Sequence, residues 1–173
     1  MSDEPTSSSR VDGHYADESC FPLVAQATVG HLRVEHADQA RTVMRRGFAR
    51  NERVMWYMDA RKATRVDALY RKQVAVYTDE LESVGHKYSV CSVVVLDKPV
   101  LRAALTAINW ITRPVITVHV VATPFEAAGL LERAWRDDGG AFTPDLLEGI
   151  RRVRTDSLQF MPVPLRAVES AHV

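Results

Sequence analysis

The residues that could carry chemistry in this 173-residue chain are its six histidines, its two cysteines and its carboxylates. Helical zinc ligands commonly stand four residues apart, and no two of the histidines have that spacing. No Cys-x-x-Cys pair is present, and the scattered glycines form no phosphate-binding loop. No Gly-x-Ser-x-Gly sequence marks a nucleophile either. We therefore expect no metal, no cofactor and no catalytic centre, because catalysis needs a nucleophile or base that a second group positions.

Two polar residues interrupt or end strongly apolar runs. His119 lies inside the β-branched run 115–121, and it either lines a pocket at the carboxyl ends of the strands or hydrogen-bonds a polar neighbour. Asp59 follows the apolar run 54–58, and its carboxylate either binds the following loop or is presented to a partner. Both interpretations remain open for each residue.

A row of arginines lies on one side of the helix predicted between residues 38 and 50. This basic ridge consists of Arg41, Arg45, Arg46 and Arg50. It is either a solvated helix face or a surface for an acidic partner protein. The acidic residues 1–20 of a second copy are one such partner, which would make the protein a homodimer. Nucleic acid is disfavoured, because 22 basic and 22 acidic side chains cancel.

Short β-branched runs alternate with segments of helical periodicity along the chain. Such alternation implies parallel strands joined by right-handed crossovers. We predict an α/β fold with a four- or five-stranded, mostly parallel or mixed open sheet and about four helices, plus an extra C-terminal helix and tail. The predicted strands cover residues 23–29 with 31–36, as a hairpin or one bent strand, and residues 54–58, 88–96 and 115–121. The predicted helices cover 38–50, 67–85, 97–113, 123–138 and 143–154.

Composition divides the chain into three parts. Residues 1–20 are acidic, serine-rich and without periodicity, so we predict a disordered leader. Residues 21–138 form the α/β domain, and residues 139–173 form the C-terminal helix and an extended tail. No apolar signal segment opens the chain, no apolar run is long enough for a membrane span, and two cysteines build no disulfide framework. These features favour a cytoplasmic protein.

The segment from His31 to Trp135 resembles a STAS domain, and especially its SpoIIAA-like branch. In that family a strand ends in aspartate, and a second aspartate precedes the helix that opens with serine. Here the strand ends at Asp59 and the second aspartate is Asp67. The helix start Phe125-Glu126-Ala127-Ala128 is similar to the last element of the family. The resemblance implies a STAS-like fold and a non-enzymatic regulatory or scaffolding module that binds a partner protein.

One departure from the family pattern changes what the resemblance implies. Ala68 and Leu69 stand where the family carries its phosphorylatable serine pair, so the phosphoserine switch is expected to be absent. The expected partner-binding residues are then the basic ridge with Asp59, Asp67, Ala68 and Leu69. The alternative is a protein with a pocket for a small apolar or lipid-like ligand. Its expected lining residues are His119, Trp110 and Trp135.

Overall fold

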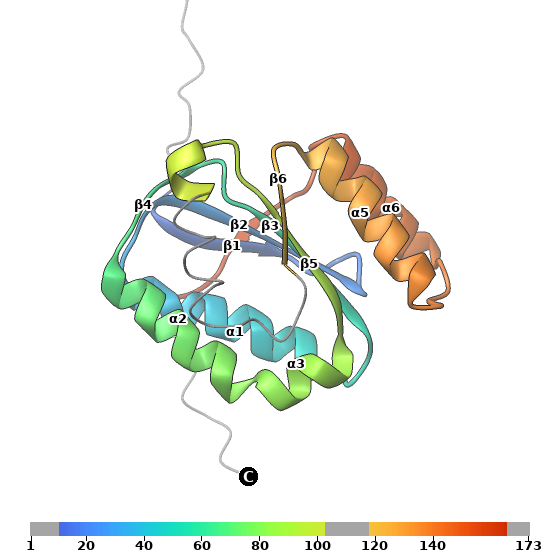
Figure 1. Ribbon diagram of the computed structural model, residues 1–173, viewed down its shortest axis with the longest axis horizontal. Helices are drawn as coiled ribbons and strands as arrows, with labels where there is room; N and C mark the ends of the chain where they lie inside the picture. The colour runs from blue at the N-terminus through green and yellow to red at the C-terminus, as the bar shows by residue number, and fades with distance from the viewer. Residues whose placement is uncertain (1–10, 103–117, 166–173) are drawn as a thin grey trace, which may run out of the picture.

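The computed structural model describes residues 11–102 and 118–165 of the chain. Within these residues seven strands form one mixed sheet with the order β6-β5-β3-β2-β1-β7, and β4 also pairs with β2 (Figure 1). Strands β2, β3, β5 and β6 are parallel, whereas β1 is antiparallel to β2 and β7 is antiparallel to β1. The strands are β1 (Gly13–Asp17), β2 (Leu23–Leu32), β3 (Val54–Asp59), β4 (Ala63–Val66), β5 (Ser89–Val95), β6 (Val118–Val121) and β7 (Met161–Pro162).

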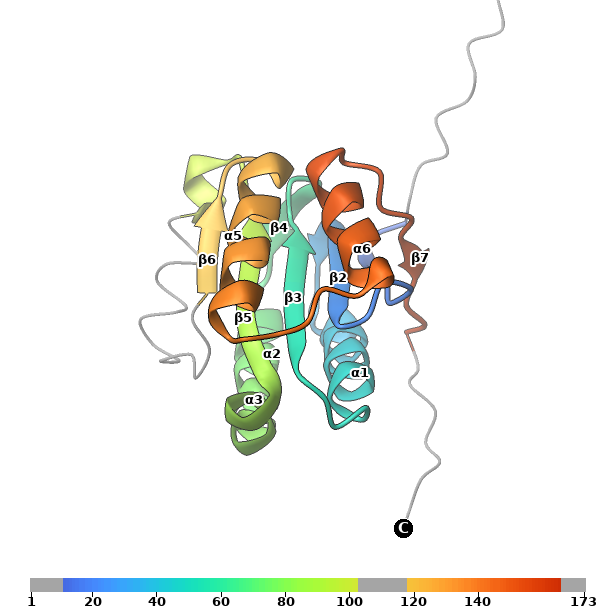
Figure 2. The ribbon, with the colours of Figure 1, turned by 90° about the vertical axis from the view of Figure 1, so that its right-hand side faces the viewer.

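Helices cover both faces of the sheet, because the chain advances from β2 to β6 in one direction and returns to β7 in the other, and right-handed crossovers in opposite directions place their helices on opposite faces. Figure 2 shows α5 and α6 in front of the strands and α1 and α2 behind them, with α3 below the start of β5. The α/β class and the mixed open sheet predicted from the sequence are confirmed; β1, β4 and β7 add to the four predicted strands. The helices that lie wholly within the described residues are η1 (Val34–His36), α1 (Ala37–Phe48), α2 (Ala68–Glu80), α3 (Glu82–Tyr88), α5 (Pro124–Asp137) and α6 (Pro144–Arg154). Most of the predicted helix 97–113 lies outside the described residues.

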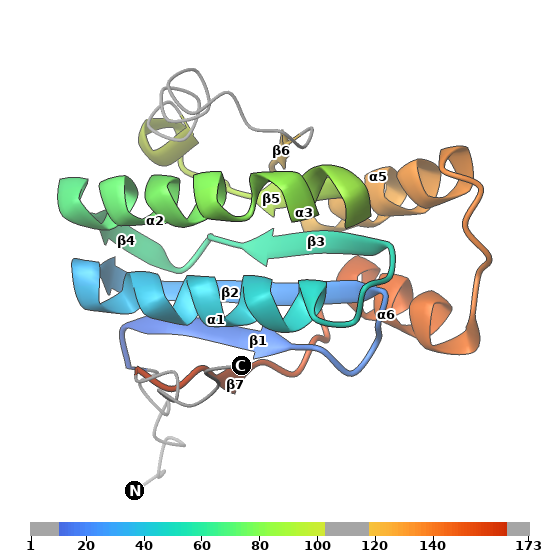
Figure 3. The same cartoon turned by 90° about the horizontal axis from the view of Figure 1, so that it is seen from below.

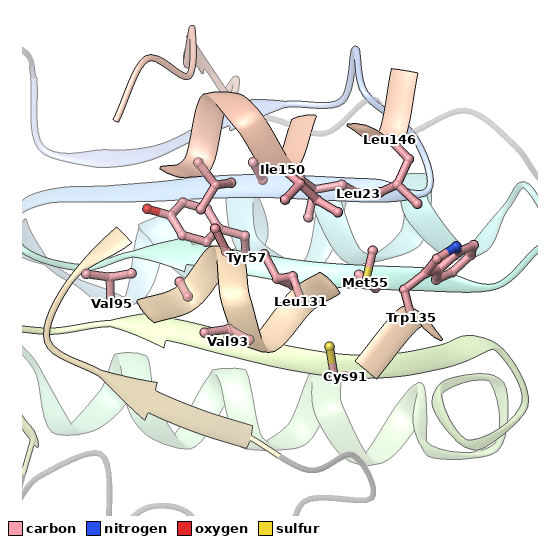
Figure 4. Close-up of a cluster of buried hydrophobic side chains, with 14 residues drawn as sticks. Leu23, Met55, Tyr57, Cys91, Val93, Val95, Leu131, Trp135, Leu146 and Ile150 are labelled. Carbon is pink, nitrogen blue, oxygen red and sulfur yellow. The ribbon is translucent and has the colours of Figure 1, made fainter. Parts of the chain in front are cut away.

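The larger hydrophobic core lies between the sheet and the pair α5 and α6 (Figure 4). Leu131 of α5 and Leu146 of α6 are fully buried against strand residues such as Tyr57. The indole of Trp135 also lies in this core and donates a hydrogen bond to the Ala141 carbonyl at 3.0 Å. The helix predicted after residue 139 therefore packs as part of the domain.

A second core lies on the opposite face, between the sheet and α1. Trp56 meets Phe48 edge to face with ring centroids 5.1 Å apart, and its indole donates to the Ser89 hydroxyl at 3.0 Å. Gly47 is required here, because a Cβ at this position would stand 2.5 Å from the Trp56 ring.

The predicted disordered leader extends too far into the chain. Residues Gly13–Asp17 form strand β1, all five are buried, and they pair with residues 25–29 of β2. The sequence gives little sign of this strand because His14 and Asp17 are polar, and two of their hydrogen-bond partners, Tyr70 and the backbone of Gln159, lie far away in the sequence. One predicted helix over residues 67–85 is in fact two, α2 and α3, which meet at Leu81.

Candidate functional site

A polar cleft of about 390 Å³ lies at the carboxyl ends of β2 and β3. Ligands commonly bind at this edge of an open α/β sheet. Its polar lining comes from the ends of β3, β5 and α6, which the sequence separates widely. The lining includes Asp59, Arg61, Lys62, Asp156, Leu158 and Phe160.

The centre of this cleft is an arginine held between two carboxylates. Arg61 donates from Nε and Nη2 to the two oxygens of Asp59, at 2.9 and 2.6 Å. It also donates from Nη1 and Nη2 to the two oxygens of Asp156, at 2.9 and 2.7 Å. These bonds, first those to Asp59 and then those to Asp156, raise the pKa of Arg61. Both carboxylates are therefore engaged in bidentate ion pairs, and the cluster joins the loop after β3 to the end of α6.

Asp59 is only 8% exposed, and it also accepts a hydrogen bond from the backbone N–H of Arg61 at 3.1 Å. The sequence left two roles open for this carboxylate, and the structure places it against its own loop.

Removing Arg61 leaves the buried Asp59 carboxylate without its ion pair. We expect Arg61→Ala to lower the free energy of unfolding by about 1–3 kcal/mol, because a buried charged group that loses its partner keeps its desolvation cost. Urea unfolding measured by circular dichroism tests this. Arg65→Ala is the control, since Arg65 has a 73% exposed side chain and should change stability by no more than about 0.5 kcal/mol. Equal effects of the two variants would contradict the structural role of the cluster.

Helix α2 begins without a side-chain cap. Asp67 is the N-cap residue, but its carboxylate instead lies 2.7 Å from Nε2 of His31 on β2. This hydrogen bond is the main cause that lowers the pKa of Asp67. The next two residues, Ala68 and Leu69, are exposed. The first turn of α2 thus presents a small and a large apolar side chain where the expected family pattern has hydroxyl groups.

Helix α2 also has an apolar outer face. Leu69 is 65% exposed and Val76 is 43% exposed. Residues seven apart lie on the same side of a helix, and Lys72 lies between them on that side. Tyr70 and Tyr77 form the buried side of α2. We call Leu69, Lys72 and Val76 the outer face of α2.

The comparisons with known proteins agree with this architecture. No family model matches the sequence, and no curated protein matches it. Among solved structures, a similar one is an uncharacterised protein of the DUF3478 family from Shewanella loihica PV-4, described as having a SpoIIAA-like fold. The two structures align with a TM-score of 0.50 and 16% identity, over 72% of this chain and 98% of that chain. The fold is SpoIIAA-like. The resemblance predicted from the sequence is thus confirmed for the fold.

In this SpoIIAA-like fold, most of the basic ridge is engaged within the chain. Arg41 lies over the Tyr77 ring at 4.5 Å and pairs with Glu80 at 2.7 Å. The remaining arginines lie near the end of α1, which is the opposite end of the molecule from the start of α2 (Figure 3). Arg46 is 3.6 Å from Glu18, Arg50 lies over the Phe21 ring at 4.2 Å, and Arg45 is exposed.

The predicted partner-binding residues therefore do not form one surface. Asp59 lies beside Tyr57 in the register that faces α5 and α6, whereas the basic ridge belongs to α1 on the other face. Only Asp67, Ala68 and Leu69 remain together, at the start of α2.

The residues proposed for an apolar ligand pocket are also separated. His119 is half-buried on β6 beside Val93, and Trp135 is part of the core. The polar cleft is lined by neither of them. Trp110 lies outside the described residues.

Three further observations concern the part of the chain that the structure describes. It contains no group of three or more histidine, cysteine or acidic side chains that could hold a metal ion. None of its helices is long and apolar enough to cross a membrane. Both cysteines are buried and free, and burial, more than the nearby Asp138, raises the pKa of the Cys91 thiol to about 12.

Sequence reasoning missed Arg61 and Asp156. The signal for Arg61 was available, because an arginine two residues after a strand-ending aspartate can reach back to its carboxylate. No local signal indicates Asp156, which lies 95 residues further along the chain.

Proposed function

We propose that this chain is a non-enzymatic regulatory module that binds a partner protein through the outer face of α2, without a phosphoserine switch. The observation that carries the proposal is the pair of exposed apolar side chains, Leu69 and Val76, on one side of a helix that starts at Ala68. Two large apolar side chains presented together on a helix suit helix-to-protein recognition better than solvent contact. The SpoIIAA-like fold supports the same conclusion. We also propose that the protein is cytoplasmic.

The surroundings of this face favour an acidic partner. Arg65 and Lys72 are exposed beside Leu69, and Arg33 lies on the loop that follows β2. Asp67, at the Leu69 end of this face, is held by His31 and pairs with Arg65 at 3.4 Å, whereas the exposed Asp79 lies at the Val76 end. A partner that carries an apolar side chain flanked by carboxylates complements this pattern, and its association should weaken as salt screens the charges.

A pair of charge substitutions tests the proposed surface. We expect Leu69→Glu combined with Val76→Glu to abolish capture of a partner that the wild-type protein captures from native extract, with little change in melting temperature. The matched control is Leu147→Glu on α6, where Leu147 is 53% exposed on the opposite layer. Capture that survives the double substitution, or that is lost equally in the control, would place the partner surface elsewhere.

Ligand binding remains a second candidate function because of the polar cleft. Its walls combine the charged cluster around Arg61 with the half-buried side chains of Leu158 and Phe160. That lining suits a small polar ligand better than a lipid. Native mass spectrometry of the purified protein would show such a ligand as a mass adduct.

A further inference from the structure

A group of buried polar side chains lies on the sheet face that α1 and α2 cover. His14 on β1 is 1% exposed, and Thr28 and Gln26 on β2 are 3% and 4% exposed. The β1–β2 register places His14 opposite Thr28, and alternate strand residues share a face, so Gln26 points to the same side. Nε2 of His14 lies 2.7 Å from the hydroxyl of Tyr70 on α2, which fixes the direction in which this group faces.

Three polar atoms of this group lack a hydrogen-bond partner within the described residues. They are His14 Nδ1, Thr28 Oγ1 and Gln26 Oε1. Other atoms nearby are paired: the backbone N–H of His14 donates to Gln39 Oε1 at 3.0 Å, and Gln39 Nε2 donates to the Val163 carbonyl. Folded proteins pair nearly all buried polar atoms, so three neighbouring exceptions require a specific explanation.

The Tyr70 contact determines which ring nitrogen of His14 carries the proton. Burial, more than the nearby His36, lowers the pKa of His14 to about 4, so the imidazole is neutral at neutral pH. Among the residues that the structure describes, the Tyr70 hydroxyl has an acceptor only if it donates to Nε2. The ring proton then resides on Nδ1, which becomes a donor.

We infer that His14, Thr28 and Gln26 form the binding site of a single buried water molecule. The water accepts a hydrogen bond from Nδ1–H of His14 and donates to Gln26 Oε1 and Thr28 Oγ1. One acceptor and two donors match the three atoms, and internal waters typically make about three such bonds. The absence of a carboxylate from this group favours a neutral guest over a cation. The site links β1 and β2 through His14 to Tyr70, and so to the first turn of α2.

The direction in which one substitution changes the melting temperature distinguishes a bound water from a hydroxyl that has no hydrogen-bond partner. Thr28→Val keeps the β-branched shape and removes Oγ1. If Oγ1 binds the water, the variant should melt roughly 2–4 °C lower than the wild type, because the water loses one of its three partners. If Oγ1 has no partner, removing it relieves its desolvation cost and the melting temperature should rise. Thr64→Val on β4, where Thr64 is exposed, is the matched control for the change in side chain.

A direct measurement complements the melting experiment. In the wild-type protein we expect a long-lived water signal in NMR cross-relaxation with the Nδ1 proton of His14, and we expect Thr28→Val to remove it. A wild-type protein without this signal, or a Thr28→Val variant more stable than the wild type, would overturn the inference.

Discussion

Deleting residues 1–20 is expected to leave the chain without a stable fold, because the deletion removes β1. This strand lies between β2 and β7, and it pairs with both. Its five residues are buried, and His14 reaches across the interior to Tyr70. Loss of β1 would expose the edge of β2 and leave the Tyr70 hydroxyl and Gln39 Oε1 without their partners, which is costly in a buried site.

Circular dichroism and amide NMR dispersion measure the outcome directly. The control is deletion of residues 1–10, whose polar, serine-rich sequence offers little apolar surface to bury; its melting temperature should match that of the full chain. A chain that lacks residues 1–20 yet melts like the full protein would show that β1 contributes nothing to the domain.

The parallel strands β2, β3, β5 and β6 were predicted from the sequence because each contains an apolar run that can be recognised locally. Continuous β-branched runs such as 93–95 are typical of strands covered on both faces, and Thr123 with Glu126 is a capping box that the structure confirms. β1 and β7 lack such signals. The two residues of β7 include a proline, and the buried His14 of β1 has its partners on α1 and α2.

The candidate site was predictable only in part for the same reason. Asp59 was recognised from its position at the end of a strand, but its ion pairs depend on the turn at residue 61 and on the end of α6. Three members of the basic ridge, Arg41, Arg45 and Arg46, lie on α1, whereas Arg50 follows its end. The partners of the ridge, Glu80, Glu18 and Phe21, come from three other segments, and a helical repeat contains no information about them.

Acidification should destabilise the protein through His14. In the unfolded chain this imidazole has its ordinary pKa of 6.5, whereas in the fold burial lowers the pKa to about 4. Between these values the unfolded chain binds more protons than the folded one, so the free energy of unfolding falls as the pH falls from 6.5 to 4. The groups around His14 are His36 of η1, Gln39 of α1 and Tyr70 of α2, and none of them is a carboxylate that could stabilise a charged ring.

The size of this effect follows from the two pKa values of His14. A difference of about 2.5 units corresponds to about 3 kcal/mol, all of it retained above pH 6.5 and lost below pH 4. Urea unfolding across this pH range measures it, with His14→Gln as the variant that cannot titrate. Carboxylates contribute equally to both proteins, so the wild type should lose about 3 kcal/mol more than His14→Gln. His86→Gln, at an exposed position on α3, should behave like the wild type. Parallel pH profiles for the wild type and His14→Gln would mean that His14 is solvated or holds its proton in the fold, and the buried contact with Tyr70 would then be wrong.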